Sequence, residues 1–150
     1  MEKRINVDVY VSDEVAGLVP IDGDSVSSFA YSVLTSNGID SCSVNIVFIN
    51  DTAIAEMNVQ YRQKEGATDV LAFILSEGGD ETLEGEVYIS LERAKAQATE
   101  FGVPFPEETM RLVTHGLLHL AGMTHDKDED LETMTATTEK LVDEFFGRGA

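Results

Sequence analysis

Three histidines in the last quarter of the chain are the residues best suited to chemistry. The segment reads His115-Gly-Leu-Leu-His119-Leu-Ala-Gly122-Met-Thr-His125 and holds all 3 histidines of the 150 residues. Side chains four apart on a helix leave one face with Cβ atoms about 6 Å apart, so His115 and His119 can reach the same metal ion. His125 can join them if the chain turns back, which a positive φ at Gly122 would allow. The spacing predicts a three-histidine metal site.

Zinc suits such a site because it accepts imidazole nitrogens in tetrahedral geometry. Three histidine ligands leave the fourth position for water, whose pKa a zinc ion can lower to about 7. The predicted chemistry is therefore hydrolysis by metal-activated water, with one Zn²⁺ as cofactor. Nickel, copper and iron also bind imidazole, so the spacing does not identify the metal.

Two simpler interpretations stay open. His115 and His119 can be ordinary polar residues at the edge of a core, with His125 near the end of their helix. A purely structural zinc usually has four protein ligands, often cysteines, and the only cysteine is Cys42, in an apolar run where we expect a small buried residue.

The same spacing occurs in the metzincin proteases, whose signature is H-E-x-x-H-x-x-G-x-x-H. Gly116 stands where those enzymes have a glutamate that acts as the general base. A metzincin-like metalloprotease is therefore an alternative that lacks its proton-handling group.

The rest of the sequence predicts the elements that position this segment. Alternation at Ile5, Val7, Val9 and Val11 predicts a first strand, and the apolar run 44–50 a second. The runs 70–75 and 86–90 are of strand length, and we expect them to pair. Five helices are expected: one capped by Asp24 and ended by Gly38, one from an N-cap at Asp51 through Arg62, one from Ser90 to near Gly102, one from Glu107 and Glu108 to Gly122, and a last one through Met134 and Phe145.

The predicted fold class is α/β (α+β). We expect a single domain over residues 1–150, with a small mixed sheet packed with about five helices and the metal site at the end of a central helix. No apolar stretch has the length of a signal peptide or a membrane span, so we expect a cytoplasmic protein without a membrane partner. The net charge of −18 means that long-range electrostatics repel a polyanion, so a phosphate-bearing substrate must be held locally.

The histidine segment resembles the signature of the YbeY family of single-domain bacterial endoribonucleases, which mature ribosomal RNA. Two further blocks resemble that family. Asn58-Val-Gln-Tyr61-Arg62 followed by Thr68-Asp69-Val70-Leu71-Ala72-Phe73 is similar to its N-x-x-Y-R and T-D-V-L-x-F stretch, and Gly85-Glu86-Val87 is similar to its G-D-I strand. The blocks cover residues 58–125, nearly half of the chain.

The chain departs from the family at four positions. Ala67, Ala72 and Ile74 replace a proline, a serine and a proline that the family usually has, and Thr124 replaces the aspartate that precedes the third histidine. The first three departures mainly affect loop stiffness. The fourth removes a carboxylate that could orient a ligand, although Asp126 is adjacent to His125 and can take that role.

The resemblance implies site residues besides the histidines. The family's motif places its catalytic arginine at Arg62, where a planar cation can bind the scissile phosphate and stabilise its developing charge. Lys64 is a candidate RNA contact. Asp69 and Asp126 are candidate supports of the site. Without the resemblance, Arg62 would be interpreted as a solvated surface residue.

The implied activity is a metal-dependent, single-strand-specific endoribonuclease that acts in ribosomal RNA maturation and ribosome quality control. Catalysis is expected from Arg62, His115, His119 and His125, with RNA binding by Arg62 and Lys64. The expected partners are ribosomal RNA and, because the protein is acidic, small-subunit ribosomal proteins or a ribosome-assembly GTPase. A non-catalytic metal-binding assembly factor and a hydrolase of small molecules stay as alternatives, besides the metalloprotease.

Overall fold

A four-stranded mixed sheet forms the centre of the protein in the computed structural model, which describes residues 4–62, 68–76, 82–122 and 128–147. The strands are β1 (Arg4–Val11), β2 (Ser41–Ile49), β3 (Val70–Ile74) and β4 (Leu83–Ser90). Their order in the sheet is β1-β2-β4-β3. β1, β2 and β4 are parallel, whereas β3 pairs antiparallel to β4 and forms one edge. The expected pairing of residues 70–75 with 86–90 is confirmed.

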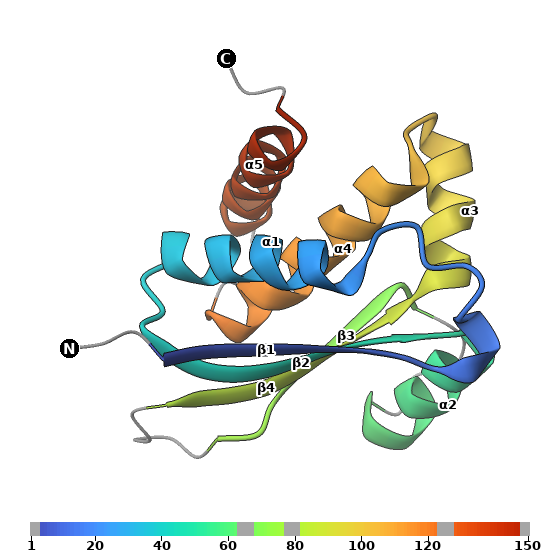
Figure 1. Cartoon of the computed structure of the whole chain (residues 1–150), viewed down its shortest axis with the longest axis horizontal. Coiled ribbons are helices and arrows are strands. Elements are labelled where there is room, and N and C mark those ends of the chain that lie inside the picture. The colour runs from blue at the N-terminus through green and yellow to red at the C-terminus, as the bar shows by residue number, and fades with distance from the viewer. Residues whose placement is uncertain (1–3, 63–67, 77–81, 123–127, 148–150) are drawn as a thin grey trace.

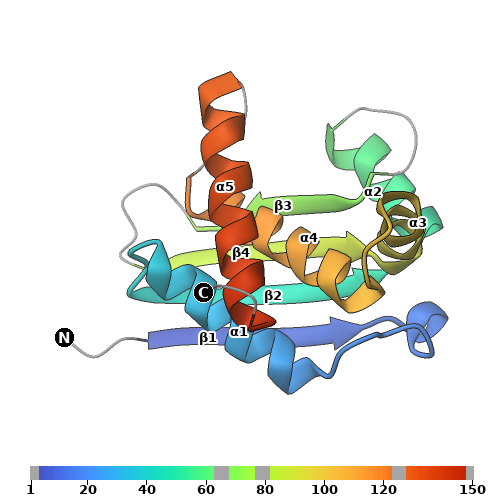
Figure 2. The same cartoon turned by 90° about the horizontal axis from the view of Figure 1, so that it is seen from above.

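Helices cover the two faces of this sheet unequally. The helices are α1 (Gly23–Ser36), α2 (Asp51–Arg62), α3 (Leu91–Phe101), α4 (Phe105–Leu120) and α5 (Asp128–Phe145), and a short 3-10 helix spans Asp13–Val15. Figure 1 shows α1, α4 and α5 on one face of the sheet and α2 on the other. Seen from above, α5 crosses over α4, which lies closer to the strands (Figure 2). The α/β fold class with a small mixed sheet and five α-helices is confirmed.

Two hydrophobic clusters correspond to these two faces. The larger one joins α1, α4 and α5 to the strands through buried side chains such as Phe29, Ile46, Leu117 and Met134. The smaller one lies under α2 and centres on Ile49, Ile54 and Leu71. Cys42 is buried within the larger cluster, as the sequence predicts. No helix in the described ranges combines the length and the apolar character that crossing a bilayer needs.

Two helix starts differ from the sequence prediction. Asp22, not Asp24, caps α1, because its carboxylate accepts a hydrogen bond from the backbone N–H of Ser25 at 3.0 Å. Asn50, not Asp51, caps α2 by accepting from the N–H of Ala53 at 2.8 Å. In both places two polar residues that favour a cap stand close together, and the cap falls to the first of them.

Helix α4 packs directly onto the sheet because two glycines remove the side chains between them. A Cβ placed on Gly116 would lie 2.4 Å from Cγ1 of Val87 on β4. A Cβ on Gly85 would lie 2.9 Å from both Cδ atoms of Leu120. These separations are below any van der Waals contact, so neither position accepts a side chain without movement of its neighbours.

We predict that Gly116→Ala destabilises the protein. The new methyl group overlaps Val87, whose β-branched side chain has little rotamer freedom, and overpacking of this kind costs about 1–3 kcal/mol of unfolding free energy. Denaturant unfolding measures the loss. Gly17→Ala is the matched control, because nothing lies within 4 Å of a Cβ there.

The double variant Gly116→Ala/Val87→Ala tests the cause. If the steric overlap is responsible, the double variant loses less stability than the sum of the two single variants. Additive losses would show that Gly116 is required for another reason.

Candidate metal centre

His115 and His119 are both on α4, and their imidazole rings point toward each other. Their Nε2 atoms are 3.1 Å apart, and their ring centroids are 4.7 Å apart with 68° between the ring planes. A tetrahedral zinc ion with Zn–N distances of about 2.0–2.1 Å holds neighbouring ligand nitrogens about 3.3 Å apart. The observed separation is close to this value, so the two imidazoles fit a shared ion. In the absence of a metal, the same distance allows one ring to donate an N–H to the other.

The third predicted ligand, His125, lies outside the described residues, as does Asp126. The predicted end of the helix and the positive φ at Gly122 are both observed. Helix α4 ends at Leu120, and Gly122 has φ +98°, the left-handed backbone expected where the chain leaves the helix axis. Within the described ranges, no three histidine, cysteine, aspartate or glutamate side chains are arranged so that they could hold a metal ion. The third ligand therefore stays a prediction.

The histidine pair lies in a cleft between α4 and the edge strand β3. The cleft has a volume of about 490 Å³. Its lining comes from Thr68, Asp69, Val70, Leu71, Ala72 and Ile74 on one side and from His115, His119 and Leu120 on the other. In the described part of the chain β3 is an edge strand of the sheet, so the cleft lies at the edge of the sheet.

Asp69 stands at the rim of this cleft. Its Oδ2 accepts a hydrogen bond from Nε2 of Gln97 on α3 at 3.3 Å, and its backbone carbonyl accepts from the N–H of Ser90 at 3.0 Å. The hydrogen bond from Ser90 fixes the start of β3, so Asp69 both begins the strand and lines the cleft with His115 and His119. Its predicted role as a support of the site is not tested by this placement.

The remaining predicted residues are only partly described. Arg62 is the last residue of α2, and the structure describes its backbone only. Lys64 lies outside the described residues. Thr68, six positions after Arg62 in the sequence, lines the cleft.

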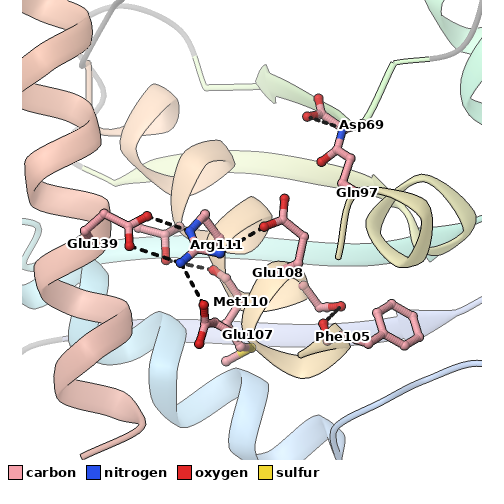
Figure 3. Close-up of polar contacts among 10 residues, drawn as sticks. Asp69, Gln97, Phe105, Glu107, Glu108, Met110, Arg111 and Glu139 are labelled. Carbon is pink, nitrogen blue, oxygen red and sulfur yellow. Dashed lines mark hydrogen bonds and ion pairs between the residues drawn. The ribbon is translucent and has the colours of Figure 1, made fainter. Parts of the chain in front are cut away.

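A buried charge cluster on α4 was missed by the sequence reasoning. The sequence predicts Glu107 and Glu108 only as the start of this helix, but they are buried, at 4% and 3% exposed. Arg111 donates to Glu107 at 3.0 Å, to Glu108 at 2.9 Å and to Glu139 of α5 at 2.6 Å (Figure 3). The spacing of three and four residues before Arg111 is the signal that could have revealed the two intrahelical pairs.

Burial and ion pairing have opposite effects on the pKa values of this cluster. Burial raises the pKa of Glu108, and the adjacent Arg111 guanidinium opposes that rise. The hydrogen bonds to Glu139 and to the other two carboxylates raise the pKa of Arg111, which stays fully charged. The guanidinium is thus committed to holding α4 against α5 and is not available to bind phosphate.

Comparisons with known proteins agree with one another. The family model described as Endoribonuclease YbeY matches residues 21–146. A protein of Desulforamulus reducens named Endoribonuclease YbeY is 36% identical over 150 residues, which cover 95% of this chain and 92% of that protein. One of the same name from Synechococcus sp. (strain CC9605) is 39% identical over 109 residues, 69% of this chain and 66% of that relative, just under two thirds of its length.

A solved structure also matches. The solution structure of a protein from Thermotoga maritima superposes with a TM-score of 0.66 at 27% identity, covering 94% of this chain and 89% of that one.

We expect the purified protein to carry about one zinc ion per chain, and His119→Ala to lose it, because two remaining imidazoles bind zinc far more weakly than three. Elemental analysis after dialysis measures the metal. Cys42→Ala is the control and should keep the ion, since the thiol is buried in β2, in the larger cluster. Stoichiometric zinc in folded His119→Ala would contradict the assignment.

Proposed function

The chain belongs to the YbeY family of endoribonucleases, and on that premise we propose that it is a metal-dependent, single-strand-specific endoribonuclease of ribosomal RNA maturation. We further propose that the protein is cytoplasmic and that it also acts in ribosome quality control. The observation that carries the metal-dependent part is the convergence of two imidazole nitrogens, 3.1 Å apart, in the cleft beside β3.

In this proposal His115, His119 and His125 hold one zinc ion. When bound, the ion supplies an open coordination position and lowers the pKa of a water there to about 7. The histidines must present neutral nitrogens to it, so metal binding competes with their protonation. The close packing of α4 on β4 supports the proposal because it holds the two helical ligands at a fixed height above the sheet.

The scissile phosphate needs a positive group from the protein, and we assign that role to Arg62. A guanidinium can donate two parallel hydrogen bonds to a phosphate and stabilise charge that grows on its oxygens. Lys64 is proposed as an additional RNA contact. Asp69 and Asp126 are proposed as positioning residues that orient a ligand ring or the bound water.

Substrate delivery is a problem for so acidic a protein. With a net charge of −18, long-range electrostatics repel RNA, and only local contacts at the cleft can offset this. We therefore propose that small-subunit ribosomal proteins or a ribosome-assembly GTPase bring the ribosomal RNA to the site. Basic ribosomal proteins would be attracted by the same charge that repels RNA.

The metalloprotease alternative is weakened by Gly116. The position that carries the general base in metzincins presses against Val87, where a Cβ alone would come within 2.4 Å. No carboxylate can occupy this place while α4 keeps its contact with the sheet. Peptide hydrolysis would need its base from elsewhere. The non-catalytic assembly factor is distinguished only by a cleavage assay.

We predict that Arg62→Ala keeps its zinc but loses cleavage of single-stranded RNA by about 100-fold or more, because it removes the group that stabilises transition-state charge. Gel-resolved cleavage of a labelled RNA by nuclease-free protein, with parallel metal analysis, measures both. Arg4→Ala, an exposed arginine of β1, is the control. A chelator should abolish cleavage by the parent protein.

Three results would overturn this function. Full nuclease activity in Arg62→Ala would remove the arginine from its role. Peptide cleavage that survives Arg62→Ala would favour the protease. Metal and ribosome association without any RNA cleavage would favour the assembly factor.

A further inference from the structure

A second cavity lies on the other side of His115 from the cleft. It has a volume of about 580 Å³ and is lined mainly by α3, α4 and α5. It shares His115 and Asp69 with the cleft that holds the histidine pair. A molecule bound at the histidines can therefore extend past His115 into this second space.

The charge of the cavity excludes phosphate. Arg111 is its one described cation, and it already donates to the carboxylates of Glu107, Glu108 and Glu139. One positive and three negative charges leave the cluster at −2, and Asp69 adds a further carboxylate to the lining. The part of a ligand that enters must be uncharged or cationic and must offer hydrogen-bond donors.

Glu108 is the acceptor best placed to meet such a donor. Its side chain is 4% exposed, and its Oε1 accepts from Arg111 at 2.9 Å. Its second oxygen accepts no hydrogen bond from any residue that the structure describes. In Figure 3 this oxygen points away from Arg111, toward the side of the cavity where Asp69 and Gln97 lie. Glu108 lines the cavity, so an acceptor oxygen without a protein donor is available there to a ligand that brings a donor.

The mouth of the cavity is apolar and aromatic. Phe101 at the end of α3 is 62% exposed, and Leu131 of α5 is 47% exposed. Both line the cavity, with Leu112 and Met134 deeper inside. Large apolar side chains left open to solvent around a pocket mark a contact surface, and an exposed aromatic ring can stack on another flat ring.

We propose that this cavity, the base pocket, receives the nucleobase next to the scissile phosphate and prefers a base that carries an exocyclic amino group. The inference rests on the proposed ribonuclease function and deepens it. A nucleobase is the uncharged, flat and donor-bearing part of an RNA, so it satisfies the charge, the aromatic mouth and the Glu108 carboxylate together. Cytosine, adenine and guanine have the amino group, whereas uracil has a carbonyl oxygen in its place, and its N3–H donor is flanked by two carbonyl oxygens that repel a carboxylate.

Oligo(C) and oligo(U) of equal length test this preference, because cytosine and uracil differ at the base edge by an amino group against a carbonyl. The zinc-bound protein should bind and cleave oligo(C) about tenfold better than oligo(U), the scale on which one well-placed contact to a base edge discriminates. Glu108→Gln should bring the ratio close to one, since an amide side chain can pair with either group. Glu100→Gln, an exposed acid on α3, is the matched control and should keep the ratio.

Phe101→Ala is a second variant that does not disturb the buried cluster. Loss of stacking should weaken binding of both RNAs by about tenfold, whereas Tyr31→Ala, a similarly exposed aromatic residue on α1, should leave it unchanged. Thermal unfolding checks that each variant is folded. Equal binding of the two RNAs by the parent protein, an unchanged ratio in folded Glu108→Gln, or unchanged binding in Phe101→Ala would each overturn the base pocket.

Fluorescence anisotropy with labelled RNA separates this inference from the nuclease function. If neither RNA is cleaved but oligo(C) still binds more tightly in a manner that depends on Glu108, the nuclease function fails and the base pocket stands. If both RNAs are cleaved and bound equally, the base pocket fails and the nuclease function stands.

Discussion

Helix α4 lies directly against the sheet, with Gly116 over Val87 and Gly85 under Leu120, and the candidate site depends on this contact. The missing side chains let the helix approach closely, and His115 and His119, on either side of Gly116 in the sequence, line the cleft beside the edge strand β3. A side chain at Gly116 would overlap Val87 unless the helix moved, and such a movement would carry both imidazoles with it. The packing of α4 on the sheet therefore also determines where the two histidine side chains lie.

Two cavities border α4, and both are lined by His115 and Asp69. On the side of the edge strand, two imidazole nitrogens converge. On the side of α3 and α5, a buried cluster of three carboxylates around Arg111 ties α4 to α5 and makes the space unfavourable for anions. An RNA bound across both cavities would be oriented by charge, with its phosphate near the histidines and its base in the acidic, apolar pocket.

The parts of this arrangement that repeat locally were predictable from the sequence. Period-two alternation indicated β1, and the four-residue spacing of His115 and His119 indicated a shared face, as the structure confirms. The order of the strands and the burial of Glu107 and Glu108 were not predictable, because both depend on where distant segments pack. The close approach at Gly116 also depends on Val87, which is 29 residues away in the sequence. Local patterns carry no information on such contacts.

We propose that three imidazoles, and no carboxylate or thiolate, hold one metal ion in this protein. X-ray absorption at the zinc edge of the metal-loaded protein tests it most directly, because outer-shell scattering from imidazole rings counts the histidine ligands. We predict three imidazole nitrogens and one further light ligand, all at about 2.0–2.2 Å. A spectrum fitted by two imidazoles or fewer, or by any sulfur, would contradict the account.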